Sequence, residues 1–122
     1  MAQKCSFLEL AKSRKTTYEY DAKAVPANAL KNILEAGRWA PSCTNSQPWH
    51  FIIVKNKERI AKLMKTANYG NFHMDPPLMI CLVLVKKACA GKEFSCFRDA
   101  ISASFDTQMS VGMAALNMIY EA

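Results

Sequence analysis

Residues 39–51 read WAPSCTNSQPWHF, a stretch that places a short polar segment between Pro41 and Pro48. Its first proline, Pro41, disfavours helical geometry in the preceding residue, so a helix should end there. The β-branched and aromatic residues 49–54 indicate a strand. A polar loop held between two prolines presents backbone groups and the amides of Asn45 and Gln47 in a fixed shape, as a flat heteroaromatic ring requires. The alternative is an ordinary helix-to-strand turn.

A helical pattern precedes this loop. Pro26 is predicted at the first position of a helix, where a proline costs no hydrogen bond. The helix should end near Ala40, and its apolar residues recur at three- and four-residue spacing. They are Leu30, Ile33, Leu34 and Gly37.

A helix and a strand are predicted after residue 54. Asn56 is expected to cap a helix from Lys57 to about Ala67. The run from Leu78 to Val85 is apolar on both faces, which predicts a central strand covered by helices on both sides. The buried stripe of the helix should consist of Ile60, Leu63 and Met64.

The last predicted element is a long helix from about Ala100 to Ala122. Its apolar face is so broad that we expect it to be buried, either in a core or in a subunit interface. Two predicted strands make a poor sheet, so either the chain is a fragment of a longer protein or another subunit completes the sheet. The apolar face consists of Phe105, Met109, Gly112, Met113, Leu116, Ile119 and Tyr120.

A short helical pattern over Cys5–Lys12 leads into the sequence SRKT at residues 13–16. A phosphate monoester is bound well by a forked guanidinium, a second cation and a hydroxyl donor, and Arg14, Lys15 and Thr16 supply these at adjacent positions. Alone, the same residues are more typical of a solvated basic turn.

The composition is that of an ordinary globular protein, with 122 residues, 51% hydrophobic and 21% charged. Its net charge of +6 suits an anionic ligand, although no nucleic-acid recognition motif appears. The five cysteines cannot all pair and lack zinc-type spacing, so we expect reduced thiols and no metal. No apolar signal core or membrane-length run is present, so we expect a cytoplasmic protein.

With these motifs in place, the chain resembles the nitroreductase family. The resemblance is carried by residues 13–16, by 30-LKNILEA-36 and above all by 39-WAPS-42 with 45-NSQPW-49. It implies an α+β fold with a central sheet flanked by helices, as one domain over residues 1–122 that lacks its C-terminal part. It also implies an FMN-dependent oxidoreductase that passes hydride from NAD(P)H to nitroaromatic, quinone or similar acceptors by a ping-pong mechanism.

The resemblance further implies a homodimer in which both subunits contribute to each flavin site. Arg14, Lys15 and Thr16 match positions that hold the flavin phosphate. Gln108 matches a position that approaches the flavin across the interface, and either Asn68 or Asn71 matches an asparagine near the ring. The loop that contacts the flavin from the other subunit corresponds to Pro41, Ser42, Cys43 and Asn45, with Cys43 expected to act through its backbone.

Several features leave the chemistry open. Tyr18 stands where many family members have a second cation, and no side chain is assigned as a catalytic acid or base. His50 is expected to point outward from its strand. The same fold also carries flavin-binding or flavin-modifying relatives that are not reductases, such as dehalogenases and heterocycle dehydrogenases, and this is the principal alternative.

Overall fold

The computed structural model describes residues 6–66, 75–85 and 100–122. The first half contains α1 (Phe7–Ser13), α2 (Ala27–Arg38) and a short 3-10 turn, η1 (Cys43–Asn45). The second contains β1 (Trp49–Val54), α3 (Lys57–Thr66), β2 (Met79–Leu84) and α4 (Ala100–Glu121). These bounds confirm the predicted elements, and helix α2 begins one residue after Pro26, which serves as its N-cap.

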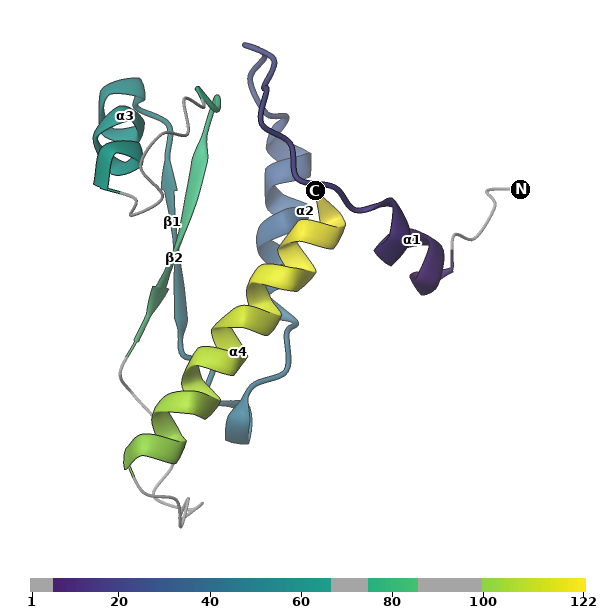
Figure 1. Ribbon diagram of the computed structural model, residues 1–122, viewed down its shortest axis with the longest axis vertical. Coiled ribbons are helices and arrows are strands. Elements are labelled where there is room, and N and C mark those ends of the chain that lie inside the picture. The colour runs from purple at the N-terminus through teal and green to yellow at the C-terminus, as the bar shows by residue number, and fades with distance from the viewer. Residues whose placement is uncertain (1–5, 67–74, 86–99) are drawn as a thin grey trace.

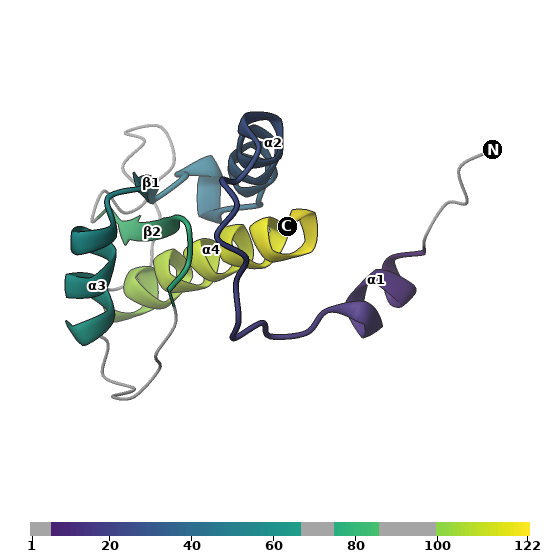
Figure 2. The same ribbon diagram turned by 90° about the horizontal axis from the view of Figure 1, so that it is seen from above.

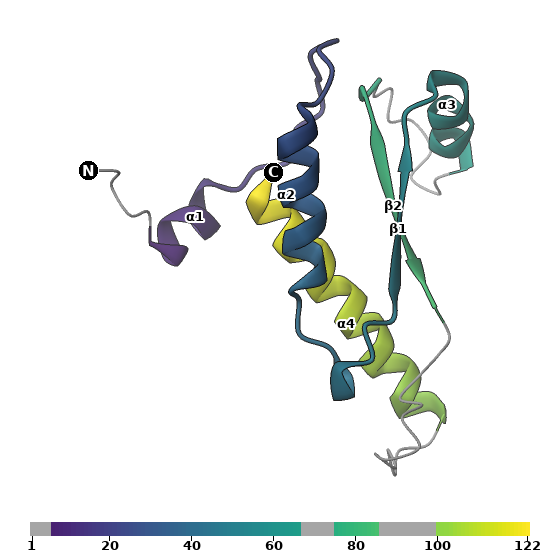
Figure 3. The ribbon, with the colours of Figure 1, turned by 180° about the vertical axis from the view of Figure 1, so that it is seen from behind.

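Helices α2 and α4 form one layer, in which α2 packs against the C-terminal part of α4 (Figures 1 and 3). Their contact is close because Gly37 presents no side chain to Met118. A hydrogen bond from Asn117 Nδ2 to the Ala36 carbonyl, 3.2 Å long, ties the two helices at the same level.

Strands β1 and β2 form an antiparallel pair beside this layer, with Trp49 opposite Leu84 and Val54 opposite Met79. Successive side chains of a strand point to opposite faces, so Trp49 and Phe51 share the face toward the helices. The core between the two layers contains Ala40, Trp49 and Ala114, with Phe51, Val111 and Met113 packed against it. This arrangement of helices over an antiparallel sheet confirms the predicted α+β class.

Two predictions about burial are wrong. Strand β2 is not covered on both sides: Val83 and Leu84 are each 39% exposed. Helices α2 and α4 lie on one side of the strand pair, and α3 lies beside one end on the other side (Figures 1 and 2). In α3 itself Ile60 is buried as predicted, but Leu63 is exposed because the helix meets the rest of the described chain along a narrower stripe than its apolar pattern indicates.

Helix α4 buries a different face from the one predicted for a core helix. Its buried side chains are the small or slender ones, which allow α2 to approach closely: Thr107, Ser110, Ala114 and Met118. Most large apolar residues of the predicted face are exposed, with Phe105 63% and Met109 61% exposed, whereas Met113 packs against the core. Most of that face therefore lies outside the core formed by the described residues.

Helix α1 projects away from the other elements (Figures 1 and 2). It begins with a capping box, in which the Ser6 N–H donates to Glu9 Oε2 at 2.8 Å and the Glu9 N–H donates to Ser6 Oγ at 3.2 Å. Its side chains stay exposed or half-buried. Phe7 meets Tyr120 edge to face, with ring centroids 5.5 Å apart, and this contact joins α1 to the last turn of α4.

Candidate functional site

The loop between α2 and β1 has an unusual backbone. Thr44, Asn45 and Gln47 have φ angles of 51°, 55° and 46°, in the left-handed region that residues other than glycine rarely adopt. Such a conformation persists only where surrounding contacts hold it. The Gln47 N–H donates to Ser42 Oγ at 3.0 Å, and Gln47 Nε2 donates to Asn45 Oδ1 at 3.0 Å. The loop is thus a preset shape rather than a simple turn.

Helix α4 supports the start of this loop. The Cys43 N–H donates to Ser110 Oγ at 3.4 Å, and the Cys43 thiol lies 3.7 Å from Asp106 Oδ2. The Cys43 carbonyl accepts from Thr44 Oγ1 at 2.7 Å. The Cys43 N–H is therefore directed toward α4, and this residue anchors the loop to that helix.

A hollow of about 380 Å³ opens beside the loop. Two predicted residues, Pro41 and Asn45, line it together with four residues that are not among the predicted site residues: Arg38, Trp39, Ala40 and Gln47. The Gln47 amide belongs to the predicted loop, whereas the sequence pattern places Arg38 and Trp39 at the end of a helix. Their position directly before the loop is the sequence signal that places them beside it.

Arg38 and Trp39 are held by one carboxylate. Glu35 Oε2 accepts from Arg38 Nη1 at 2.8 Å, and Glu35 Oε1 accepts from the Trp39 indole N–H at 2.9 Å. The indole is nonetheless 78% exposed, an uncommon state for so large an apolar ring. These contacts hold a flat aromatic surface and a cation at the edge of the hollow.

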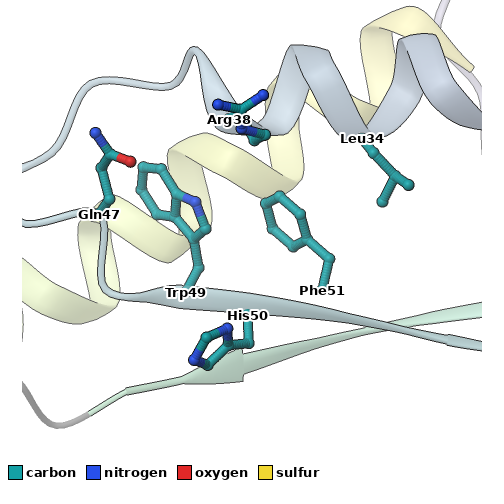
Figure 4. A pocket seen from close by; sticks show the side chains of 6 residues that line it. All are labelled: Leu34, Arg38, Gln47, Trp49, His50 and Phe51. Carbon is teal, nitrogen blue, oxygen red and sulfur yellow. The ribbon is translucent and has the colours of Figure 1, made fainter.

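A second hollow, of about 370 Å³, lies between α2 and β1 and shares Arg38 and Gln47 with the first (Figure 4). Trp49 and Phe51 point into it from the strand with nearly parallel rings, 6.3 Å between centroids and 6° between planes. His50 points away from these two rings, as strand alternation predicts (Figure 4).

The predicted phosphate-binding residues lie elsewhere. Arg14 and Lys15 are exposed and line a hollow of about 700 Å³ between the end of α1 and the last turn of α4. Thr16 is also exposed, while its neighbour Thr17 lines the hollow. The other lining residues are Leu10, Ser13, Tyr20, Ile119, Tyr120 and Ala122.

One chain does not bring Arg14 and Asn45 together. The loop is anchored at Ser110 near the middle of α4, whereas Arg14 shares a hollow with Tyr120 in the last turn of that helix (Figure 1). Ten residues of helix correspond to roughly 15 Å along its axis. The two predicted parts of the site are thus separated within a single copy.

Gln108 is exposed and lies on the turn of α4 that carries Ser110. Asn68 and Asn71, the alternatives for an asparagine near a ring, lie outside the described residues. Within residues 6–66, 75–85 and 100–122, no group of three or more histidine, cysteine, aspartate or glutamate side chains could hold a metal ion. None of the helices in these ranges has the length and hydropathy needed to cross a membrane.

These features define an α+β architecture with a preset loop beside two hollows, and comparison with known proteins identifies the family. Residues 11–122 match the model of the nitroreductase family, and the chain belongs to that family. It is 33% identical over 84 residues to the oxygen-insensitive NAD(P)H nitroreductase of Salmonella typhimurium, covering 68% of this chain and 38% of that protein. It is 26% identical over 72 residues to the iodotyrosine deiodinase of Haliscomenobacter hydrossis, covering 59% of this chain and 32% of that protein.

The fold is also found among solved structures. A nitroreductase-type structure from Desulfovibrio desulfuricans in complex with FMN superposes with a TM-score of 0.74 and 25% identity. The match covers 98% of this chain and 63% of the other. The chain therefore spans about two fifths of the curated relative from Salmonella and under two thirds of this structural relative.

Proposed function

We propose that the whole protein is an FMN-dependent oxidoreductase that transfers hydride from NAD(P)H to nitroaromatic, quinone or similar acceptors. The observation that carries the proposal is the preset loop at residues 42–47, which exposes Asn45 beside a hollow while its own hydrogen bonds hold the backbone. Family membership and the FMN-bound structural relative support flavin as the ligand for which that shape is suited.

The described residues fit the two ends of FMN. Arg14 is exposed, and its guanidinium would donate two hydrogen bonds to the phosphate oxygens of FMN. Lys15 would add a second positive charge and Thr16 a hydroxyl. At the other end, the exposed Asn45 amide offers both a donor and an acceptor to the polar edge of a flat ring. When bound, FMN supplies the hydride chemistry, and the protein positions the ring and excludes competing reactions.

We further propose a homodimer in which the loop, with Gln108, of one subunit meets the phosphate-binding residues of its partner. The separation of Arg14 from Asn45 along α4 supports this arrangement, because two copies related by a two-fold axis can join what one copy keeps apart. The outward apolar face of α4 supports it as well, since large exposed apolar patches mark interaction sites.

The principal alternative is a flavin-dependent dehalogenase. It is favoured by the likeness to the deiodinase of Haliscomenobacter hydrossis, which spans much of the same chain. Fold likeness alone does not separate the two reactions, since the same scaffold carries different chemistries.

A single preparation of the full-length protein tests the proposal. We expect a yellow protein that releases FMN on denaturation and oxidises NADPH or NADH with nitrofurazone or menadione, with parallel double-reciprocal plots as ping-pong turnover requires. A colourless protein that cannot be loaded with FMN would refute flavin dependence. A flavin-loaded protein that ignores these acceptors but releases halide from a halotyrosine would favour the alternative. Cell fractionation checks the expected cytoplasmic location.

A further inference from the structure

Ser110 is the more deeply buried of two polar residues, Thr107 and Ser110, on the buried face of α4. It is 1% exposed, and its neighbours on that face include Ala114, which lies one turn further along α4. A buried hydroxyl is unfavourable unless it is hydrogen-bonded. Alanine would also be the better helix former at this position. The Ser110 hydroxyl is therefore explained by its hydrogen bonds to other parts of the chain and not by a contribution to helix stability.

The Ser110 hydroxyl links the helix to the loop. Its Oγ donates to the Asp106 carbonyl at 2.7 Å, which fixes the direction of its lone pairs. With that donor engaged, the oxygen accepts from the Cys43 N–H at 3.4 Å. The bond is long, and it joins residues 67 positions apart in the sequence, so it links the loop directly to α4.

Cys43 is the residue from which the strained part of the loop continues. Thr44 and Asn45, the next two residues, both adopt left-handed backbone geometry, and Asn45 is exposed at the hollow. Moving the Cys43 amide would move the residues that follow it. A hydrogen bond at Cys43 therefore controls where the Asn45 side chain is presented.

We propose that Ser110 is a positioning residue, which locks the loop and the Gln108 turn of α4 into one rigid half of the flavin site. Ser110 acts through the Cys43 amide and touches no ligand itself. The inference rests on the proposed function, because Ser110 is proposed to strengthen the binding of FMN. Gln108 lies two residues from Ser110 on the same turn of α4, so a hydrogen bond that fixes this turn against the loop also fixes the backbone at Gln108 relative to the loop.

Asn117 provides a matched control on the same helix. Its side chain also makes a hydrogen bond to a distant backbone group, the Ala36 carbonyl at 3.2 Å. That bond ties α4 to α2 and does not reach the loop. Loss of either hydrogen bond should loosen the packing of α4. Only loss of the Ser110 bond should also disturb residues 43–47.

The test compares Ser110→Ala with Asn117→Ala in the full-length protein. FMN affinity is measured by flavin fluorescence quenching, thermal stability by circular dichroism, and amide hydrogen exchange by NMR on the flavin-free protein. We expect Ser110→Ala to weaken FMN binding about fivefold or more, as the loss of a typical hydrogen bond does, and to speed exchange at residues 43–47. Asn117→Ala should keep FMN affinity within about twofold even if it lowers the melting temperature similarly.

Equal FMN affinity in wild type and Ser110→Ala would overturn the inference, as would equal losses in the two variants. If the wild-type protein takes up no FMN, the proposed function itself fails and this inference fails with it. If the wild type binds FMN and Ser110→Ala exchanges no faster at residues 43–47, the proposed function stands and only the positioning role of Ser110 is refuted.

Discussion

Gly37 of α2 lies directly against Met118 of α4. A methyl group added to Gly37 would stand 2.8 Å from Met118 Cγ and 2.9 Å from Phe51 Cζ, closer than carbon atoms approach without displacement. Because Phe51 comes from the sheet, this one position controls the spacing of all three packed elements. Gly37 also lies two residues before Trp39, the first residue of the motif at residues 39–49.

We expect Gly37→Ala to destabilise the protein by about 1 to 3 kcal/mol, the usual cost of overpacking a core. The gain in helix propensity, roughly 1 kcal/mol, offsets part of this cost. Urea unfolding followed by circular dichroism measures the change. Asn32→Ala, at an exposed site of the same helix, is the matched control and should be neutral or stabilising.

A second substitution distinguishes steric crowding from other effects of Gly37→Ala. Shortening Met118 to alanine removes two of the three nearest atoms, so Gly37→Ala should cost less in a Met118→Ala background than in the wild type. Strict additivity of the two changes in unfolding free energy would argue against crowding at this contact.

Much of the fold could be predicted because its signals are local. The prolines around the loop, the cap at Asn56 and the apolar run in β2 each determine their own element, and the structure confirms them. Which face of α4 is buried could not be predicted in this way. The helical period and the hydrophobicity of the residues predict that the large apolar side chains of α4 are buried. Which face is buried depends instead on packing against α2, where Gly37 contacts Met118, and these two residues are 81 positions apart in the sequence.

The site was predictable to a similar extent. The motif at residues 39–49 indicates a ligand loop, yet nothing local shows that its amide at Cys43 would bind Ser110. The left-handed geometry at Thr44 and Gln47 was also hidden, since neither residue favours it intrinsically. Such features depend on tertiary contacts that hold an unfavourable backbone.

Replacing Arg14 with alanine should weaken FMN binding about tenfold to a hundredfold, because a hydrogen bond to a charged group contributes about 1.5 to 3 kcal/mol. Titration of flavin fluorescence measures the dissociation constant. Arg59→Ala removes an exposed arginine from α3 and is the matched control, with affinity expected to be unchanged. Equal FMN affinity of the Arg14→Ala and Arg59→Ala variants would show that Arg14 does not bind the flavin phosphate.

The capping box of α1 predicts a pH dependence. The backbone N–H of Ser6, and secondly its hydroxyl, lower the pKa of Glu9 by hydrogen bonding to the carboxylate. Because the folded-state pKa is depressed, the cap is stabilising above the unfolded-state pKa and is lost as the pH falls through the folded-state value. Ser6→Ala should raise the Glu9 pKa part of the way back, since the backbone bond remains. An NMR titration of the Glu9 carboxyl carbon measures this, and an unchanged pKa would contradict the hydroxyl contribution.

Leu116 of α4 tests the proposed dimer. It is 44% exposed within one chain, on the same outward face as Met109 and Phe105, so a partner subunit would bury it. An aspartate placed there would become a buried unpaired charge, which is costly in an interface but harmless on a free surface. We expect Leu116→Asp to dissociate the dimer in analytical ultracentrifugation.

Leu63 of α3 is the matched control for that substitution, because it is a leucine of similar exposure, 38%, on a helix outside the proposed interface. Leu63→Asp should leave the dimer intact. FMN affinity should fall together with dimerisation in Leu116→Asp, since each monomer then holds Arg14 beside the last turn of α4 and the Asn45 loop beside its middle. A monomeric Leu116→Asp protein that binds FMN as tightly as the wild type would show that one subunit builds the whole flavin site.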